Sequence, residues 1–228
     1  MKDVDIHILR AKSLKERAYE ILKELIFTGK LEPEILYNES RLAAKLGVSR
    51  TPVREALLEL SGEGMVLFVP GKGVKVQEIT EAQVHDVYEI RKLIEGHIIM
   101  KITPLMTPSH LSRMKTIINK QKKMAEKKDM LAFIRADREL HFYLSSIRGN
   151  RQMDSVLLNL RDQIERMGIK AVENDTRPGR VIEEHSAFLS ALERGSETEA
   201  YDTLIAHLCN SEKSLISSIK DGEDAVIN

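Results

Sequence analysis

The spacing of hydrophobic residues predicts helices along most of the chain and one short β-hairpin. In the first third, apolar residues recur every three or four positions in three runs, as on one face of a helix. These runs cover residues 14–28, residues 39–46 and a segment that begins after residue 49. Two β-prone stretches follow at 65–69 and 74–76, on either side of the turn-forming sequence Pro-Gly-Lys-Gly, and they predict a hairpin.

Two of the predicted helices meet across a very short connection. Asn38 and Ser49 are residue types that cap helix N-termini, and Gly47 suits the left-handed position after a helix end. Pro52 falls in the first turn of the third helix, where the hydrogen-bond ladder requires no N–H. Two short helices joined by so tight a turn and followed by a hairpin predict a winged helix-turn-helix.

After Gly73 the pattern is helical, with brief breaks and no strand-like alternation beyond Val76. Capping residues and helix breakers predict about six helices, which begin near residues 80, 107, 129, 151, 176 and 196. The fourth is expected over 151–173, and the sixth is expected to end near residue 220. The fold class is therefore mainly α, with a winged helix-turn-helix domain at 1–78 and an all-α bundle at 79–228.

Composition and charge narrow the class of protein. Hydrophobic residues make up 42% of the chain and charged residues 31%, which is typical of a soluble globular protein. No stretch approaches the roughly 20 apolar residues that a membrane-spanning helix needs. There is one cysteine, Cys209, and the N-terminus lacks the apolar run of a signal peptide, so we expect a cytoplasmic protein.

Lys and Arg balance Asp and Glu at 35 each, which excludes a protein that holds nucleic acid by overall charge alone. The charge is unevenly spread, however. Residues 10–78 contain 12 Lys and Arg against 10 Asp and Glu, while residues 79–228 contain 22 against 23. The small positive surplus therefore falls in the predicted winged helix, although so mild an asymmetry does not identify a partner by itself.

The third predicted helix has the chemistry of a DNA-reading helix. Arg50 and Arg54 are four residues apart and share one face, and arginine reads guanine through two parallel hydrogen bonds. Ser49 and Thr51 lie at the N-terminal turn, where hydroxyl and N–H groups suit phosphate oxygens. Lys72, at the tip of the hairpin, is placed to reach the DNA backbone or the minor groove.

The alternative is that these arginines form a solvated helix face, paired with Glu55 and Glu59. For two arginines on an arbitrary helix that interpretation would be preferred. The tight turn before the helix and the glycine-tipped hairpin after it favour DNA binding instead.

Four residues of the predicted bundle form a candidate metal site. Asp137 and His141 are four apart on one helix face, and His185 and His207 lie on the apolar faces of two later helices. Three imidazoles and one carboxylate suit a divalent ion such as Zn²⁺, Ni²⁺ or Mn²⁺. Taken singly, each histidine is more often a hydrogen-bonded core residue, and Asp137 with His141 could be a surface pair.

The stretch LGVSRTPVREAL at residues 46–57 resembles the recognition segment of the GntR family of bacterial transcription regulators. This resemblance implies a homodimer that binds a short inverted repeat in double-stranded DNA. It also implies that Arg50 and Arg54 read bases, and that Ser49, Thr51 and Gly71 contact the backbone or a groove.

The order Asp137-x-x-x-His141, Glu184-His185 and His207 is similar to the FCD ligand-binding domain of the FadR subfamily. Such domains hold a metal at these four positions, and many members use that metal to bind the carboxylate of a small organic acid. Arg91 matches an arginine common near the start of these domains, where it would meet a carboxylate, and it could equally be a structural ion-pair residue.

We therefore expect a sequence-specific transcription regulator, not an enzyme, whose operator affinity responds to a small carboxylate bound at a metal. One alternative is a regulator whose effector is the metal itself. A less favoured alternative is a metal-dependent enzyme fused to a DNA-binding domain, since three histidines and an aspartate could activate water. No other residue in the sequence clearly declares itself as a general base or nucleophile, and Glu184, the only adjacent acid, could face solvent.

Since the chain carries no net charge, we expect modest non-specific DNA binding and a shallow dependence on salt. The affinity for a random duplex, measured by fluorescence anisotropy over a range of KCl concentrations, tests this. A logarithmic slope near about −9, which ten or so phosphate contacts would give, would contradict it.

Overall fold

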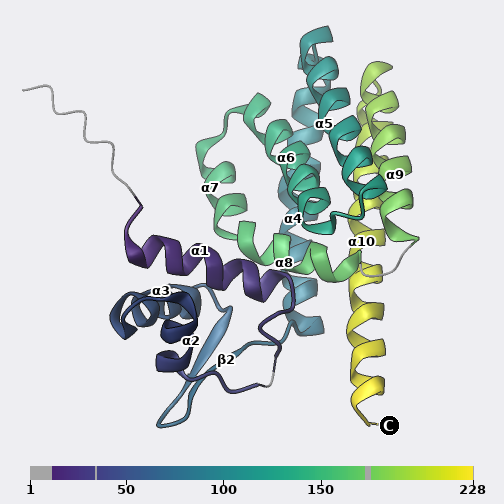
Figure 1. The fold of residues 1–228 in the computed structure, drawn as a ribbon. Coiled ribbons are helices and arrows are strands. Elements are labelled where there is room, and N and C mark those ends of the chain that lie inside the picture. Colours follow the sequence, from purple (N-terminus) through teal and green to yellow (C-terminus); the bar gives the residue numbers. More distant parts are fainter. Residues whose placement is uncertain (1–11, 34, 173–175, 228) are drawn as a thin grey trace, which may run out of the picture. The chain divides into compact units, whose positions relative to one another are not determined.

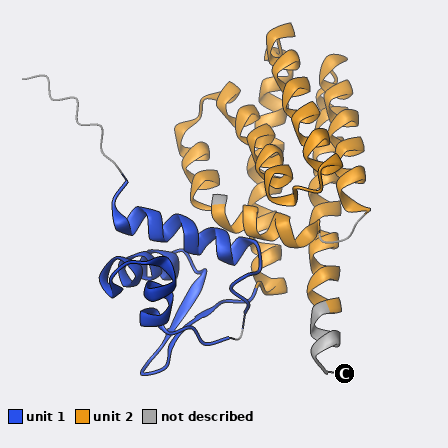
Figure 2. Cartoon of the chain, viewed as in Figure 1, with its two compact units in different colours: residues 1–78 blue, residues 79–228 orange. Residues whose placement is uncertain are grey.

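The computed structural model describes residues 12–33, 35–172 and 176–227, with the backbone alone at residues 161 and 222–227. The chain divides into two compact units, Met1–Glu78 and Ile79–Asn228 (Figure 2). Each unit has its own hydrophobic core. Within the described residues, no helix combines the length and apolar character needed to cross a bilayer.

The described part of the first unit contains three helices and a two-stranded hairpin (Figure 1), which confirms the predicted winged helix-turn-helix. Helix α1 packs against α3, and α2 also contacts α3. Leu22, Leu57 and Leu60 are fully buried between them. The elements are α1 (Leu14–Phe27), α2 (Glu39–Leu46), α3 (Arg50–Gly62), β1 (Val66–Val69) and β2 (Gly73–Val76).

Local capping explains where the helices of this unit begin and end. The Asn38 side chain accepts hydrogen bonds from two N–H groups in the first turn of α2, and Gly47 adopts the left-handed conformation after its end. Ser49 occupies the N-cap of α3, but its side chain makes no capping bond. The Ser49 hydroxyl therefore makes no hydrogen bond to the first turn of α3, the helix that carries the candidate DNA-reading residues.

The hairpin is antiparallel, with Val66 opposite Val76 and Val69 opposite Gly73. Tyr37 pairs with Val74 on the other side of β2, so the segment before α2 extends the small sheet. Gly73 lies against this segment with φ 129°, a conformation that favours glycine. A Cβ atom at Gly73 would lie 2.3 Å from the Tyr37 carbonyl oxygen.

The second unit is a helical bundle. Helix α10 packs along α4, α8 and α9, while α5 packs against α6 and α9. A continuous core of Ile, Leu, Val, Met and Phe side chains fills the interior. The helices are α4 (Glu81–Ile102), α5 (Pro108–Glu126), α6 (Met130–Arg148), α7 (Arg151–Asn159), α8 (Arg161–Ala171), α9 (Arg177–Glu193) and α10 (Glu197–Ile227), with a 3-10 turn at Thr103–Leu105.

Two details of this unit differ from the sequence prediction. The expected single helix over 151–173 is divided at Leu160 into α7 and α8, which run in different directions (Figure 1). No Gly or Pro marks this position; instead α7 packs on α6, whereas α8 packs across α6 and α10. The described part of the unit therefore has seven α-helices rather than about six, and α10 extends to Ile227 rather than ending near residue 220.

Replacement of Gly73 by alanine should destabilise the first unit by about 3 kcal/mol, because the new methyl group would overlap the Tyr37 carbonyl. Gly71→Ala is the matched control. Gly71 also has a positive φ, but no atom lies within 4 Å of its hypothetical Cβ, so its cost should be about 1 kcal/mol. Thermal unfolding of the two variants, followed by circular dichroism, compares them. Equal melting temperatures would contradict the steric explanation.

Candidate functional site

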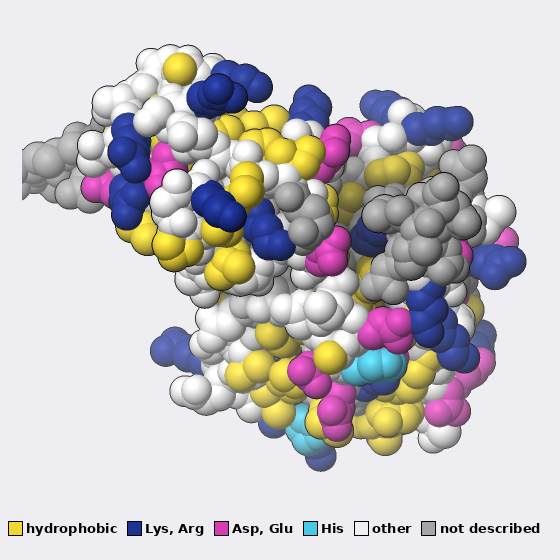
Figure 3. Space-filling model, turned by 90° about the horizontal axis from the view of Figure 1, so that it is seen from below, with side chains coloured by type: hydrophobic (Ala, Val, Ile, Leu, Met, Phe, Trp, Pro, Cys, Tyr) yellow, Lys and Arg dark blue, Asp and Glu magenta, His cyan; other side chains and the backbone are white. Residues whose placement is uncertain are grey.

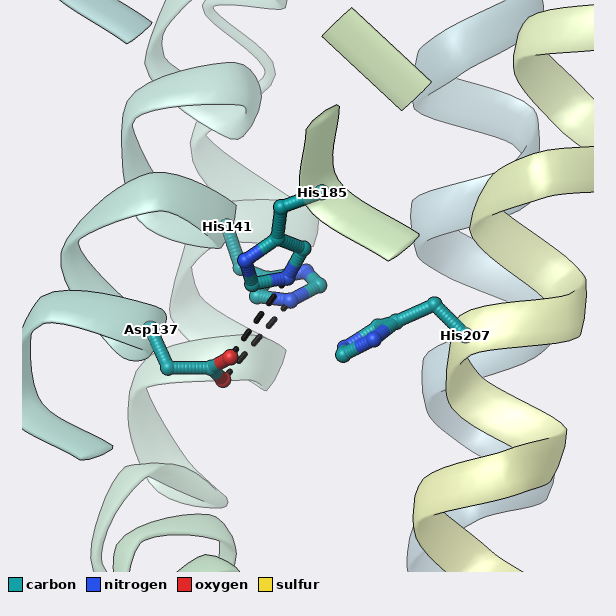
Figure 4. A group of neighbouring side chains, drawn as sticks. All are labelled: Asp137, His141, His185 and His207. Atoms are coloured by element: carbon teal, nitrogen blue, oxygen red, sulfur yellow. Dashed lines mark ion pairs between the residues drawn. The ribbon is translucent and has the colours of Figure 1, made fainter. Parts of the chain in front are cut away.

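Four side chains of the second unit converge at one point in its interior. Asp137 and His141 project from α6, His185 from α9 and His207 from α10 (Figure 4). One ligand atom from each lies within 4.8 Å of the others. The three histidines are buried, with His185 only 1% exposed. The structure thus brings together all four residues of the predicted metal site.

Two of the imidazoles are held from outside by carboxylates, the buried Glu95 and the partly buried Glu184. Nδ1 of His207 lies 2.8 Å from Oε2 of Glu184, and Nδ1 of His141 bonds to Oε2 of Glu95. Since an ionised carboxylate only accepts hydrogen bonds, Nδ1 carries the proton in both rings. The Nε2 atoms are then unprotonated in the neutral rings, and each presents a lone pair.

The third imidazole is oriented by an amide. Nδ1 of His185 lies 2.8 Å from Oε1 of Gln121, whose Nε2 donates to Oδ1 of Asp137 at 3.2 Å. The Nε2 atoms of His141 and His185 are buried without a hydrogen-bond partner, 3.8 and 3.5 Å from the Asp137 oxygens. Lone pairs therefore face a carboxylate, an arrangement that is unfavourable unless a cation lies between them.

The electrostatics of the centre favour a metal ion over a proton as that cation. Burial lowers the pKa of His185 and of His207, so neither ring is readily protonated. Burial alone would raise the pKa of Asp137, yet the histidines in their protonated form and the permanently charged Arg91 hold it well below its usual range, so the carboxylate is ionised. Bonds of about 2.0–2.2 Å to one tetrahedral ion place ligand atoms roughly 3.3–3.6 Å apart, so the widest pair of ligand atoms would have to close by about 1 Å.

The two carboxylates behind the histidines are each paired with a buried arginine. Arg91 donates through Nε to Glu95 at 2.7 Å, and Arg177 binds Glu184 through both Nη atoms at 2.7 and 2.9 Å. Burial opposes ionisation of both glutamates, but the arginine and histidine partners lower their pKa values to about 2. Two chains of the form arginine–glutamate–histidine thus end at the same centre.

A small cavity of about 20 Å³ adjoins the centre, with room for about one water molecule. Arg91 and Arg177 lie on its wall together with Asp137 and His207, while α8 contributes an apolar side. Arg91, the residue predicted to bind the effector, is 4% exposed and already paired with Glu95. The structural ion pair that the sequence left as one alternative is therefore present, and Arg91 also lines the cavity, while its contact with an effector carboxylate stays a prediction.

Sequence reasoning missed several of these contacts. Glu184 does not face solvent freely: its side chain is 17% exposed and binds His207, Arg177 and Asn210. The seven-residue spacing from Arg177 to Glu184 places them on the same helix face, a signal that could have been found. The contacts of Glu95 and Gln121 join residues 46 and 64 positions apart, and local spacing does not indicate them.

In the first unit, the candidate DNA-binding residues lie on an exposed surface. Ser49, Thr51 and Arg54 are exposed at the start of α3, together with Arg50, whose side chain is 59% exposed. Arg50 and Arg54 line one groove with Gly71 and Lys72 of the hairpin turn. On the face of the molecule in Figure 3, Lys and Arg side chains are dispersed among hydrophobic and acidic ones, in keeping with the zero net charge.

The alternative pairing of the arginines with Glu55 and Glu59 is not found among the described ion pairs. Both arginines bind Glu39 of α2, Arg50 through Nε and Arg54 through Nη1, each at 2.9 Å. Glu59 pairs with Lys15 instead. Glu39 is 6% exposed, and sequence reasoning did not single it out.

Comparison with known proteins agrees with this architecture. Residues 14–76 match the family described as bacterial regulatory proteins, gntR family, and residues 86–210 match the FCD domain. This chain belongs to the GntR family of regulators with an FCD domain. It is thus a DNA-binding transcriptional regulator, and its FCD domain indicates ligand binding.

Relatives of this regulator align over nearly its whole length. The HTH-type transcriptional regulator YdhC of Bacillus subtilis is 26% identical over 211 residues, covering 90% of this chain and 92% of YdhC. The HTH-type transcriptional repressor RspR of Escherichia coli is 23% identical over 221 residues, 97% of each chain. These relatives are regulators, not enzymes, which argues against the metalloenzyme alternative.

Solved structures share the fold. McbR/YncC of E. coli superposes with a TM-score of 0.71 at 23% identity, covering 92% of this chain and all of the other. A transcriptional regulator GntR from Rhodococcus sp. RHA1 gives a TM-score of 0.76 at 22% identity, covering 90% and 99%.

The four converging side chains predict one tightly bound divalent transition metal per chain. The double variant His185→Ala/His207→Ala should retain less than about a tenth of the metal, since two of four ligands are lost. His97→Ala, at an exposed position on α4, is the control and should bind as the parent does. Metal content after dialysis, measured by plasma mass spectrometry, gives the result. Unchanged metal in the double variant would show that the site is wrongly assigned.

Proposed function

We propose that the operator affinity of this regulator is controlled by a small carboxylate that binds to a divalent metal held by Asp137, His141, His185 and His207. The observation that carries the proposal is the meeting of unpartnered imidazole nitrogens with an ionised carboxylate in a buried site. When bound, the metal would supply a Lewis-acidic position for an anionic ligand. Analysis of the bound metal would distinguish among Zn²⁺, Ni²⁺ and Mn²⁺.

The charges around the centre support an anionic effector. Around the centre, Arg91 is matched by Glu95 and Arg177 by Glu184, which leaves Asp137 with one unmatched negative charge. A divalent cation reverses this to one positive charge, which a carboxylate would neutralise. Arginine side chains on the cavity wall suit the same ligand, because guanidinium binds carboxylate in a bidentate manner.

The size of the cavity supports coupling between the ligand and the shape of the domain. An organic acid is larger than the single water that fits in about 20 Å³, so its entry requires the walls to move. Those walls come from α4, α6, α8, α9 and α10. Helix α4 follows strand β2 of the winged helix after only four residues, 77–80, so a shift of α4 is covalently connected to the DNA-binding unit.

The effector acts by linkage: it changes operator affinity only as far as it binds one arrangement of the protein more tightly than the other. In this proposal two copies of the chain form a homodimer on a short inverted repeat. Arg50 and Arg54 read bases, Ser49, Thr51 and Gly71 contact the backbone or a groove, and Lys72 extends from the hairpin.

Metal alone is the second candidate effector, since the cavity beside the site is no larger than a water molecule. Operator affinity, measured with a duplex selected from a random pool, separates the two candidates. Metal-loaded protein should change its dissociation constant by about tenfold or more with one of acetate, propionate, malonate or succinate. Acetamide, the neutral control, should have no effect, and metal-free protein should not respond to any of them.

A full change in affinity on adding metal alone, with no further effect of carboxylates, would favour the metal as effector. An equal response to acetamide and acetate would contradict recognition of the carboxylate charge. Arg91→Lys keeps the positive charge but loses the planar fork, so it should weaken the carboxylate response more than it weakens metal binding.

A further inference from the structure

We infer that Glu39 is a positioning residue for DNA recognition, which holds Arg50 and Arg54 in the orientation that reads bases. The inference rests on the proposed base-reading role of these two arginines. Glu39 is the first residue of α2, while both arginines lie in the first two turns of α3. The contact therefore bridges the two helices of the helix-turn-helix.

The contact has the geometry of a shared clamp. Oε2 of Glu39 accepts from Nε of Arg50 at 2.9 Å, and its two oxygens accept from Nη1 of Arg54 at 2.9 and 3.1 Å. One carboxylate thus fixes two guanidinium groups that would otherwise sample many rotamers. The Arg54 guanidinium also lies 5.7 Å from the ring centre of Phe68 on β1, which fixes its other side.

The burial pattern argues that this cluster does more than stabilise the fold. The Glu39 side chain is 8% exposed, whereas those of Arg50 and Arg54 are 59% and 51% exposed. Burial of a carboxylate is unfavourable, and its pairing with two largely solvated arginines returns little stability. The buried carboxylate of Glu39 therefore serves mainly to orient the two exposed arginine side chains.

The atoms that remain available are those that base reading requires. Arg50 uses Nε for Glu39, which leaves the edge formed by its two Nη groups directed away from that bond. A guanidinium binds O6 and N7 of guanine through two adjacent N–H donors. Arg54 uses only Nη1 for Glu39, so its remaining donors are available to a base or a phosphate.

Glu39 also sets the net charge of the recognition surface. The trio of Glu39, Arg50 and Arg54 carries one net positive charge rather than two. This reduces attraction to phosphates at any sequence while leaving oriented donors for the correct bases. Glu39 is therefore expected to raise the ratio of specific to non-specific affinity rather than affinity itself.

The test uses the full-length protein and two duplexes of equal length and composition, one selected from a random pool by the parent protein and one scrambled. We expect Glu39→Gln to lower the ratio of the two affinities by about tenfold, within the range that one bidentate arginine–guanine contact provides. Binding to the scrambled duplex should be retained or strengthened, because a negative charge is lost. Glu39→Asp, which keeps the charge but shortens the reach, should lower the ratio as well.

Glu59→Gln is the matched control, since it removes the same charge from α3 in a pair with Lys15 and should leave the ratio within about twofold. If both Glu39 variants keep the parental ratio, Glu39 does not position the arginines and the inference is wrong. A lowered ratio in Glu39→Gln with a parental ratio in Glu39→Asp would also overturn it, because charge alone would then explain the effect.

Arg50→Ala separates this inference from the proposed function. If Arg50→Ala leaves the ratio unchanged, the base-reading assignment itself fails; if it lowers the ratio and the Glu39 variants do not, only the inference about Glu39 fails. Melting temperatures of all variants show whether a lowered affinity ratio reflects unfolding. A new selection of duplexes from the random pool with the Glu39→Asp variant gives the base preference, a readout that stability does not affect. A relaxed base preference at the Arg50 contact supports positioning, and an unchanged preference contradicts it.

Discussion

The second unit is organised around a group of hydrogen-bond acceptors that face one another. The Nε2 atoms of His141 and His185 lie 3.8 and 3.5 Å from oxygens of the Asp137 carboxylate, and neither Nε2 atom has a hydrogen-bond partner. Buried acceptors that face one another are costly. Helices α6, α9 and α10 therefore bring together a set of side chains that, in the proposed function, a bound cation would complete.

The carboxylates that bind the histidines connect this centre to further residues of the bundle. Glu95 lies on α4 and Glu184 on α9, and each joins a histidine to a buried arginine. Such outer hydrogen bonds fix the tautomer and the ring orientation of a metal-binding histidine. They also mean that a ligand that displaces one group disturbs a whole chain of contacts, including helix α4, which continues from the winged helix.

The first unit contains a similar arrangement, in which a carboxylate orients arginine side chains instead of histidine side chains. There the buried group is the carboxylate of Glu39, and the groups that it orients are the exposed Arg50 and Arg54. In both units an acid restricts the rotamers of a side chain that, in the proposed function, contacts a ligand. Preorganisation of this kind lowers the entropy lost on binding, and it explains why charged groups are kept in places where they contribute little to stability.

The sequence by itself determined most of the helices and the hairpin, because these depend on local rules. Hydrophobic period, capping residues and turn glycines act over a few positions, and the winged helix-turn-helix followed from them. The four ligand positions came from helix faces together with resemblance to a family. By contrast, the kink at Leu160 has no local breaker, and Glu39, Glu95 and Gln121 find their partners across the fold. Only the tertiary structure decided these features, since they depend on which helix packs beside which.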